Sequence, residues 1–461
     1  MKKLASVFIL VWIALVGLQA QNEEMMKEDT GDKSRKLQYF SEPGFKSLNE
    51  FETPKSTSVE YDGLKVRVGG DFALQFQALD HSNAAGAPQL IPLGNNINLP
   101  SANLNLDVQL HRGVRMHLRT YLSSRHHNET WVKGGYIQMD QLDFISDDFL
   151  SGLMDIASFR IGMEMPNYGD AHFRRSDNAN AIQNPFVGNY IMDAHTTEPF
   201  IEATFQPGDF LVVAGATNGL FNPTVNNSYI PWGSEKYAGE LDDFKPTYYG
   251  KLGWDSQLNQ DIRVRLTGSF YTAQGTDNGD HLYSGDRAGA RYYHVMDYVA
   301  ADSTVVTDFR SGRFNPGFVK EMAFQVNPFV KFKGLEFFGV FEQTTGTDGS
   351  GNRENGQFTQ LGAELLYRFG SWDQFYVGSR FNRVSGYGDY ASGGTQPDTK
   401  LIDRVNVGGG WFLTKNTLVK LEYVMQQYNE NFKGTWGNPD APTNLTNGKF
   451  NGFVLESVIS F

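Results

Sequence analysis

The chain has 461 residues, with 52 acidic side chains against 40 basic ones and no cysteine. Its acidity makes it a poor candidate for binding nucleic acid, and the lack of cysteine excludes disulfides and zinc–thiolate sites. Aromatic residues make up 14% of the chain and there are 49 glycines. This excess suits the aromatic girdles and the crowded, tilted strands of a transmembrane β-barrel.

Residues 1–20 have the features of a secretory signal peptide. Two lysines precede an apolar run from Leu4 to Leu18, and Ala20 ends a plausible cleavage site. The run is short for a transmembrane helix and no stop-transfer pattern follows it. Residues 21–62 are polar and charged without sustained periodicity, so the sequence predicts a periplasmic N-terminal tail there.

Long alternations of apolar and polar residues begin after residue 62. The first runs from Lys65 to Leu79, which exceeds an ordinary globular strand of about 5–6 residues and suits a tilted transmembrane strand of about 9–11 residues with extensions. Fifteen more strands are predicted at 104–111, 114–122, 130–141, 157–165, 199–206, 210–217, 246–255, 261–272, 319–333, 334–346, 356–369, 373–385, 400–414, 416–428 and 449–461. The total is even, as in bacterial single-chain barrels.

The linkers alternate in length. Tight turns are predicted at 112–113, 207–209, 256–260, 333–334, 370–372 and 415, and most linkers between them are long: 80–100, 166–198, 218–245, 273–318, 386–399 and 429–448. The fold class is therefore all-β: a 16-stranded antiparallel transmembrane β-barrel over 63–461, with short periplasmic turns and long extracellular loops. One linker on the turn side, 142–156, is long, and either a small amphipathic helix or a misplaced strand would explain it. A β-propeller would need a repeat of about 40–50 residues, and none is found.

The last predicted strand should close the barrel against the first. Phe453, Leu455 and Ile459 share one face of it, and Glu456 is the single charge on the other. An unpaired edge strand with such a face would invite aggregation, whereas pairing with Lys65–Leu79 removes the exposed edge. We expect Glu456 to lie close to Lys65 or Arg67.

With these strands laid out, the chain resembles the phosphate-selective porin O and P family of outer-membrane channels. The resemblance is carried by the order of the strands, by the strand Phe159–Pro166 that runs into a long loop, and by Phe461 at the end of the final strand. Asn167-Tyr168-Gly169 stands where the family tends to carry Pro-Phe-Gly, so this motif is altered. The resemblance implies a homotrimeric, water-filled, anion-preferring channel in the outer membrane of a Gram-negative bacterium. It also implies contacts with outer-membrane lipids, and recognition of Phe461 by the barrel assembly machinery.

The inward faces of the predicted strands carry slightly more basic than acidic residues. Rows of Arg and Lys along a pore favour anions, because guanidinium groups bind phosphate and carboxylate oxygens in a fork. The alternative is that opposite charges pair across the wall and only keep the lumen hydrated. The predicted pore-lining and constriction residues are Arg115, Arg119, Arg160, Arg174, Arg175, Arg263, Arg265, Lys251 and Arg380.

The loop 166–198 is predicted to narrow the channel. Its apolar residues, among them Ile182, Phe186 and Ile191, would form an exposed patch in water. Folding against the inner wall would bury them and bring Arg174 and Arg175 into the path of solutes. The alternative is that the loop packs over a trimer centre or the outer rim.

The predicted function is passive diffusion of small hydrophilic solutes with a mild preference for anions such as phosphate or carboxylates. No catalytic site, cofactor or metal site is predicted; His126-His127 lacks the spacing of a metal motif. Two alternatives stay open. One is a barrel enzyme, a lipase or protease, which would need a Ser/His/acid set on one face. The other is a surface anchor or adhesin whose lumen is plugged.

Overall fold

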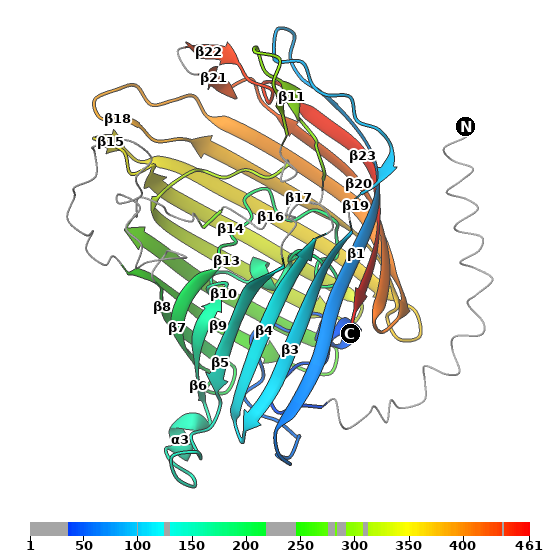
Figure 1. Ribbon diagram of the computed structural model, residues 1–461, viewed down its shortest axis with the longest axis vertical. Helices are drawn as coiled ribbons and strands as arrows, with labels where there is room; N and C mark the ends of the chain where they lie inside the picture. Colours follow the sequence, from blue (N-terminus) through cyan, green and yellow to red (C-terminus); the bar gives the residue numbers. More distant parts are fainter. Residues whose placement is uncertain are drawn as a thin grey trace.

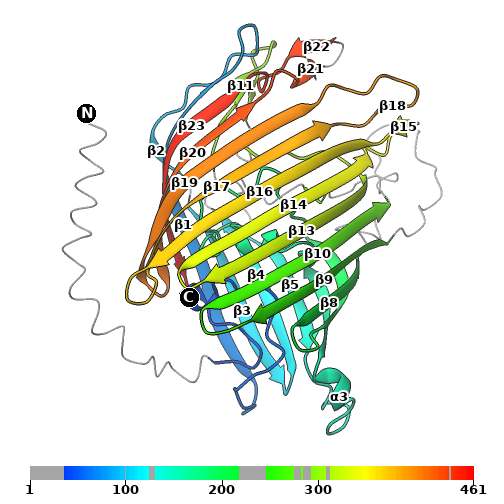
Figure 2. The same ribbon diagram turned by 180° about the vertical axis from the view of Figure 1, so that it is seen from behind.

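The computed structural model describes residues 36–98, 100–123, 130–217, 246–274, 282–283, 292–307, 312–435 and 438–461. They form one closed antiparallel β-barrel (Figures 1 and 2). Its strands are β1 (Lys65–Ser82), β3 (Ser101–His111), β4 (Val114–Ser123), β5 (Trp131–Met139), β6 (Ala157–Glu164), β7 (Glu198–Phe205), β8 (Phe210–Thr217), β9 (Thr247–Gln257), β10 (Ile262–Gln274), β13 (Lys320–Phe332), β14 (Leu335–Thr347), β16 (Gly356–Phe369), β17 (Phe375–Tyr387), β19 (Lys400–Thr414), β20 (Thr417–Tyr428) and β23 (Lys449–Ser460). The predicted sixteen-stranded barrel is thus confirmed.

The barrel closes where its first and last strands meet. β1 pairs with both β3 and β23, and the β1–β23 ladder runs from Asp71 opposite Ser460 to Ser82 opposite Lys449. The backbone of Phe461 extends this contact, because its N–H and C=O both bond to Gly70 at 3.0 Å. Every strand of the wall therefore has two neighbours.

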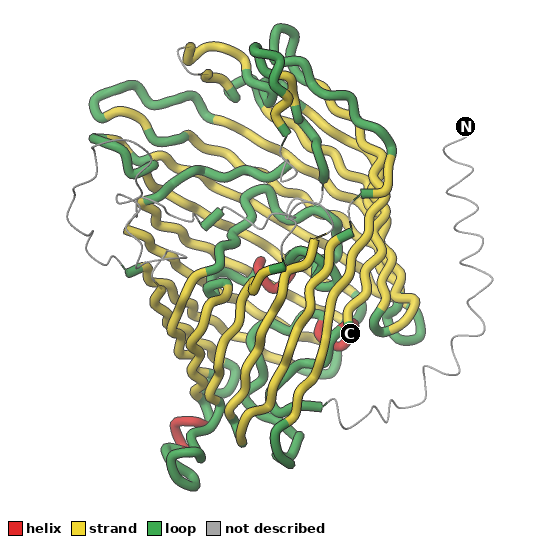
Figure 3. The backbone as a smooth tube through the Cα atoms, viewed as in Figure 1, coloured by secondary structure: helices red, strands yellow, loops and turns green. Residues whose placement is uncertain are grey.

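Several shorter elements accompany these strands. They are β2 (Asn96–Ile97), the hairpins β11 (Tyr298–Val299) with β12 (Val305–Val306) and β21 (Lys433–Thr435) with β22 (Asn438–Pro442), the antiparallel pair β15 (Arg353–Glu354) with β18 (Tyr390–Ala391), and the helical turns η3 (Gly44–Ser47), α3 (Ser151–Met154) and η4 (Ala171–Arg174). The long linker 142–156 contains α3 and no strand, and α3 protrudes beyond the end of the barrel that carries the short turns (Figure 1). Figure 3 shows the longer loops gathered at the opposite end.

The outer wall is apolar. Leu252, Ile201 and Phe453 point outward and are 65%, 58% and 54% exposed, although they lie in the middle of strands. At the end with short turns, the rings of Phe369, Phe375 and Trp411 stack along neighbouring strands. An apolar band with an aromatic edge is the surface that a bilayer covers. None of the helices in the described ranges is long and apolar enough to cross a membrane.

The core of the protein lies inside the barrel. Inward residues of the wall pack against residues of the loop 166–198, such as Tyr168, Val187 and Ile191, and against Tyr292 and Phe318 from the chain between β10 and β13. A second cluster joins Ile182 and Phe186 to the wall. Figures 1 and 3 show chain running through the interior of the barrel.

The prediction for Glu456 is wrong. Its carboxylate bonds to Lys420 at 2.7 Å and to the side-chain amide of Gln75 at 2.9 Å, not to Lys65 or Arg67. The reason is the register of β1 against β23, in which Gln75 lies opposite Glu456. The first residues of β1 extend past the end of β23, out of reach of Glu456.

Candidate functional site

The loop 166–198 lies within the barrel, against the inner wall, and is held at three places. The first is Asp170, a fully buried carboxylate. It accepts hydrogen bonds from Lys251 at 2.9 Å, from Arg265 at 2.8 and 2.9 Å and from Thr267 at 2.8 Å. Burial by itself would raise the pKa of Asp170, but the charges of Lys251 and Arg265 outweigh it and hold that pKa below its usual range.

Gly169 lets the loop approach the wall at this point. Its φ of +65° lies in the left-handed region, and a Cβ there would lie 2.0 Å from the side-chain oxygen of Gln325. Its carbonyl accepts a hydrogen bond from Lys251 at 2.8 Å. Glycine is therefore required by both the backbone conformation and the close contact.

The second anchor joins the later part of the loop to β16, β17 and β20. Arg380 bonds to Glu364 at 2.7 Å and to the carbonyl of Gly188 at 2.6 Å. Lys420 donates to the carbonyl of Ala181 at 2.9 Å, and Glu422 accepts from the backbone N–H of Val187 at 2.8 Å. Side chains of the wall thus supply hydrogen-bond partners for backbone groups of the loop, which are not paired in a sheet.

The third anchor carries the loop across to the opposite wall. Asp177 bonds to Arg119 at 2.9 Å and also pairs with Lys133, while its carbonyl accepts from Asn103 at 3.0 Å. Burial raises the pKa of Asp177, but the field of Lys133, His195 and Arg119 lowers it well below its usual range. The loop therefore spans the lumen from β9 and β10 to β3, β4 and β5.

Residues 36–53, which we call the strap, also lie within the barrel. The carboxylate of Glu52 bonds to Arg265 at 2.7 Å and to Lys251 at 3.1 Å. Phe51 packs edge-on against Phe329 with ring centroids 5.4 Å apart, and the carbonyl of Asn49 accepts from Arg263 at 3.0 Å. These residues fall in the segment 21–62 predicted as a periplasmic N-terminal tail, and they lie inside the end of the barrel that carries the short turns, where the N–H of Phe45 bonds to the carbonyl of Lys415.

Each of the nine predicted pore-lining residues forms an ion pair. The shortest distances lie between 2.7 and 3.1 Å: Arg115 with Asp140, Arg119 with Asp177, Arg160 with Glu202, Arg174 with Glu364, Arg175 with Asp193, Arg263 with Asp255, Arg265 with Glu52, Lys251 with Asp170, and Arg380 with Glu364. Arg174 also bonds to Asn49 of the strap. All nine face the interior of the barrel and each has a carboxylate partner, although Arg174 and Arg380 share Glu364.

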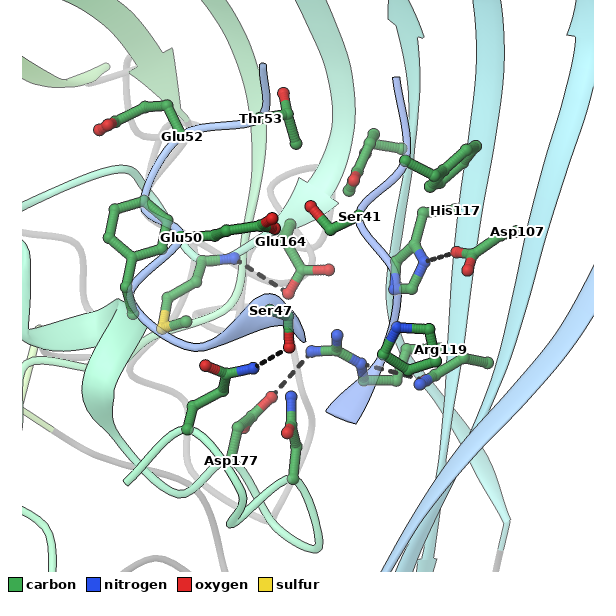
Figure 4. A pocket seen from close by; sticks show the side chains of 18 of the residues that line it. Ser41, Ser47, Glu50, Glu52, Thr53, Asp107, His117, Arg119, Glu164 and Asp177 are labelled. Atoms are coloured by element: carbon green, nitrogen blue, oxygen red, sulfur yellow. Dashed lines mark hydrogen bonds and ion pairs between the residues drawn. The ribbon is translucent and has the colours of Figure 1, made fainter. Parts of the chain in front are cut away.

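A cavity of about 360 Å³ remains between the strap, the loop and the wall made by β1 and β3–β7 (Figure 4). Four of the nine predicted residues line it: Arg115, Arg119, Arg160 and Arg175. The other five lie away from it, packed behind the loop and the strap. Sequence reasoning missed the contribution of the strap, whose Glu50 and Glu52 also line the cavity, because nothing in an aperiodic polar segment shows which wall it will contact.

The structure also bears on catalysis and metals. His117 donates through Nδ1 to the carboxylate of Asp107 at 2.7 Å, but its Nε2 has no hydrogen-bond partner among the described residues. An Asp–His pair without a serine at Nε2 does not form a Ser/His/acid triad. Within the described part of the chain, no group of three or more His, Asp or Glu side chains could hold a metal ion; His126-His127 lies outside it.

No family model and no curated protein matches the chain. Solved structures do show similarity in fold. Examples are OmpT, an outer membrane protein of Vibrio cholerae (8% identity, 87% of this chain and 99% of that chain, TM-score 0.48) and an anion-selective porin from Comamonas acidovorans (10%, 86% and 100%, 0.47). The outer membrane channel DcaP of Acinetobacter baumannii is another (9%, 87% and 99%, 0.45). The identities are low, so the description of this chain as a transmembrane-type barrel rests on its own strand pairing and its apolar outer wall.

Proposed function

We propose that the protein is an outer-membrane porin of a Gram-negative bacterium, through which small hydrophilic solutes diffuse passively. The observation that carries this proposal is the contrast between the two faces of the barrel. The outer face is apolar, while the inner face is charged, hydrogen-bonded and hollowed by a cavity of about 360 Å³. A closed barrel with these two faces suits a polar passage across a bilayer.

The mild anion preference expected from the sequence is not part of this proposal. It depended on a slight excess of basic over acidic side chains on the inward faces, and the nine basic residues predicted to line the pore all form ion pairs with carboxylates. Assembly as a homotrimer, insertion by the barrel assembly machinery and membership of the phosphate-selective porin family stay predictions.

A second candidate function is a surface anchor or adhesin with a plugged lumen. The loop and the strap favour it, because together they bury wall residues such as Arg380, Arg404 and Lys420 to 1% exposure. In this case the extracellular loops would carry out the function, and the barrel would only anchor them in the membrane.

Recording in planar bilayers distinguishes the two candidates. Purified protein reconstituted into a bilayer should give stepwise, ohmic currents, and liposomes that contain it should swell in small sugars. A folded, inserted protein that passes neither ions nor sugars would contradict the porin function and favour the anchor.

A further inference from the structure

The charges that line the cavity are not balanced. Its lining contains the guanidinium groups of Arg67, Arg115, Arg119, Arg160 and Arg175, no lysine, and the carboxyl groups of Glu42, Glu50, Glu52, Asp71, Asp107, Glu164, Asp177 and Glu202. Carboxylates therefore outnumber cations in this lining, but two of them pair with cations outside it: Glu42 with Lys46, and Glu52 with Lys251 and Arg265.

Each arginine in this lining forms an ion pair, although Arg119 shares Asp177 with Lys133 and Arg175. Besides the pairs given above, Arg67 bonds to Asp107 at 2.7 Å. The two charges of such a pair lie a few ångströms apart, so their fields largely cancel for an ion farther away. The electrostatic attraction of these arginines for an anion in the lumen is therefore weak.

Three carboxyl groups of the lining are not part of such a pair, although the charge of Arg119 acts on both Asp71 and Glu164. Among the described residues, no Lys, Arg or His nitrogen forms an ion pair with Glu50, Asp71 or Glu164. Asp71 accepts a hydrogen bond from the amide of Asn105 at 3.2 Å, and Glu164 accepts one from the backbone N–H of Met165 at 3.4 Å. They come from three elements, the strap, β1 and β6, so they are spread around the cavity and are not one acidic cluster; Figure 4 shows Glu50 and Glu164 among its lining side chains.

Basic groups elsewhere in the barrel do not reach this space. Arg404 and Lys420 are each 1% exposed and donate to backbone carbonyls, Arg404 to Asn189 and Gly312, Lys420 to Ala181. The cluster formed by Lys251, Arg263 and Arg265 is matched by Asp170, Asp255 and Glu52. Glu52, which belongs to the strap, is therefore one of the three carboxylates that pair with this basic cluster.

We propose that the cavity between the strap, the loop 166–198 and the wall of β1 and β3–β7 selects cations over anions. The solutes that pass along it are then small cationic or uncharged hydrophilic molecules. This inference rests on the porin function proposed above. Carboxylates on a narrow passage with low-dielectric walls concentrate cations, as acidic rings do in cation channels. The preference is opposite to the one that the number of inward basic residues suggests.

The test is the reversal potential of the full-length protein in a planar bilayer under a KCl gradient. We expect a value on the cation side of zero. The nearly isosteric variants Glu164→Gln, Asp71→Asn and Glu50→Gln should each shift it toward the anion side, and the triple variant should shift it most. The matched control is Asp209→Asn, an exposed acidic residue in the short turn between β7 and β8 that does not line the cavity; it should leave the value unchanged.

A reversal potential at zero or on the anion side would overturn the cation preference and leave the porin function standing. So would variants that shift the potential no more than Asp209→Asn does. Absence of current from inserted protein would instead overturn the porin function, and this inference with it. Retention of the folded band on unheated gels shows that the variants have not simply unfolded.

Discussion

The two sides of the lumen use the same residue types in different ways. On the side of β9–β23, Lys251, Arg380, Arg404 and Lys420 are at most 2% exposed and hold the loop 166–198 in place. On the side of β1–β7, Arg119 and Arg160 keep part of their side chains exposed, 17% and 20%, beside a cavity. We call these the sealed side and the open side.

The difference is that charge on the sealed side stabilises the fold, whereas charge on the open side is available to solutes. A buried ion pair is costly to break, because the remaining partner is left charged without water. A partly exposed pair contributes little to stability. The same substitution should therefore affect stability on one side and permeation on the other.

The largest expected effect is on the sealed side, at Asp170. Asp170→Ala leaves Glu52 and Asp255 as the remaining carboxylate partners of Lys251 and Arg265, and breaking such a buried network costs about 3–5 kcal/mol. The free energy of unfolding in detergent micelles should fall by that amount, and conductance should rise as the loop detaches. The exposed control Asp209→Asn should stay within about 0.5 kcal/mol of the natural chain. Equal stability of the two variants would contradict the structural role of Asp170.

The next effect concerns the strap. Phe51→Ala removes a ring that is 6% exposed and packs against Phe329 and Phe173, and truncation of a buried Phe costs about 3–5 kcal/mol at most sites. Because the strap has no strand ladder to hold it, we expect it to leave the lumen and single-channel conductance to increase. If conductance stays at the natural value while the variant remains folded, the strap does not narrow the passage.

A smaller effect should appear as pH falls, through His172 of the loop. Desolvation, followed by the charge of Lys251, lowers the pKa of this imidazole well below its usual value. The unfolded chain takes up a proton below pH of about 6.5, whereas the folded loop does not, so stability is full above that pH and is lost below it. Thermal unfolding at pH 8 and 5.5 should differ less in His172→Gln than in the natural chain; an unchanged difference would exclude His172 as the cause.

The smallest effect on stability should come from the open side. Arg160→Ala leaves Glu202 without its partner at 2.7 Å, but Glu202 keeps the hydrogen bond that it accepts from Tyr249 at 3.0 Å. Because Arg160 is partly exposed while Glu202 is buried, we expect a loss of about 1 kcal/mol, the upper end of what an exposed pair contributes. The reversal potential should nevertheless move further toward the cation side. A large loss of stability, or a shift toward the anion side, would mean that the two sides do not differ as described.

Much of the barrel could be predicted from the sequence, because alternation at period two fixes both a strand and its inward face. The strand at 400–414 has the predicted bounds in the structure, and Arg404 and Arg380 do face inward. Register is set by the whole ladder and not by one strand. For this reason the partner of Glu456 was misassigned, although its inward direction was predicted correctly.

The candidate site was harder to predict. Counting inward basic residues could not show that each would meet a carboxylate, since Asp170 and Asp177 come from an irregular loop and Glu52 from an aperiodic segment. Alternation carries no information about such segments; their partners depend on how they cross the barrel. The apolar residues of the loop 166–198 were a usable signal, because they had to be buried somewhere, and they lie inside.

The most direct test of the difference between the two sides uses the fact that the chain has no cysteine. Ser158 of β6 lines the cavity, whereas Ser269 of β10 faces the interior and does not line it, although the two serines are similarly buried, at 7% and 6% exposure. Single-channel current should be measured in Ser158→Cys and Ser269→Cys before and after addition of a small cationic methanethiosulfonate reagent. We predict that the current falls in Ser158→Cys and is unchanged in Ser269→Cys. Block in Ser269→Cys with none in Ser158→Cys would contradict the placement of the passage along β1–β7.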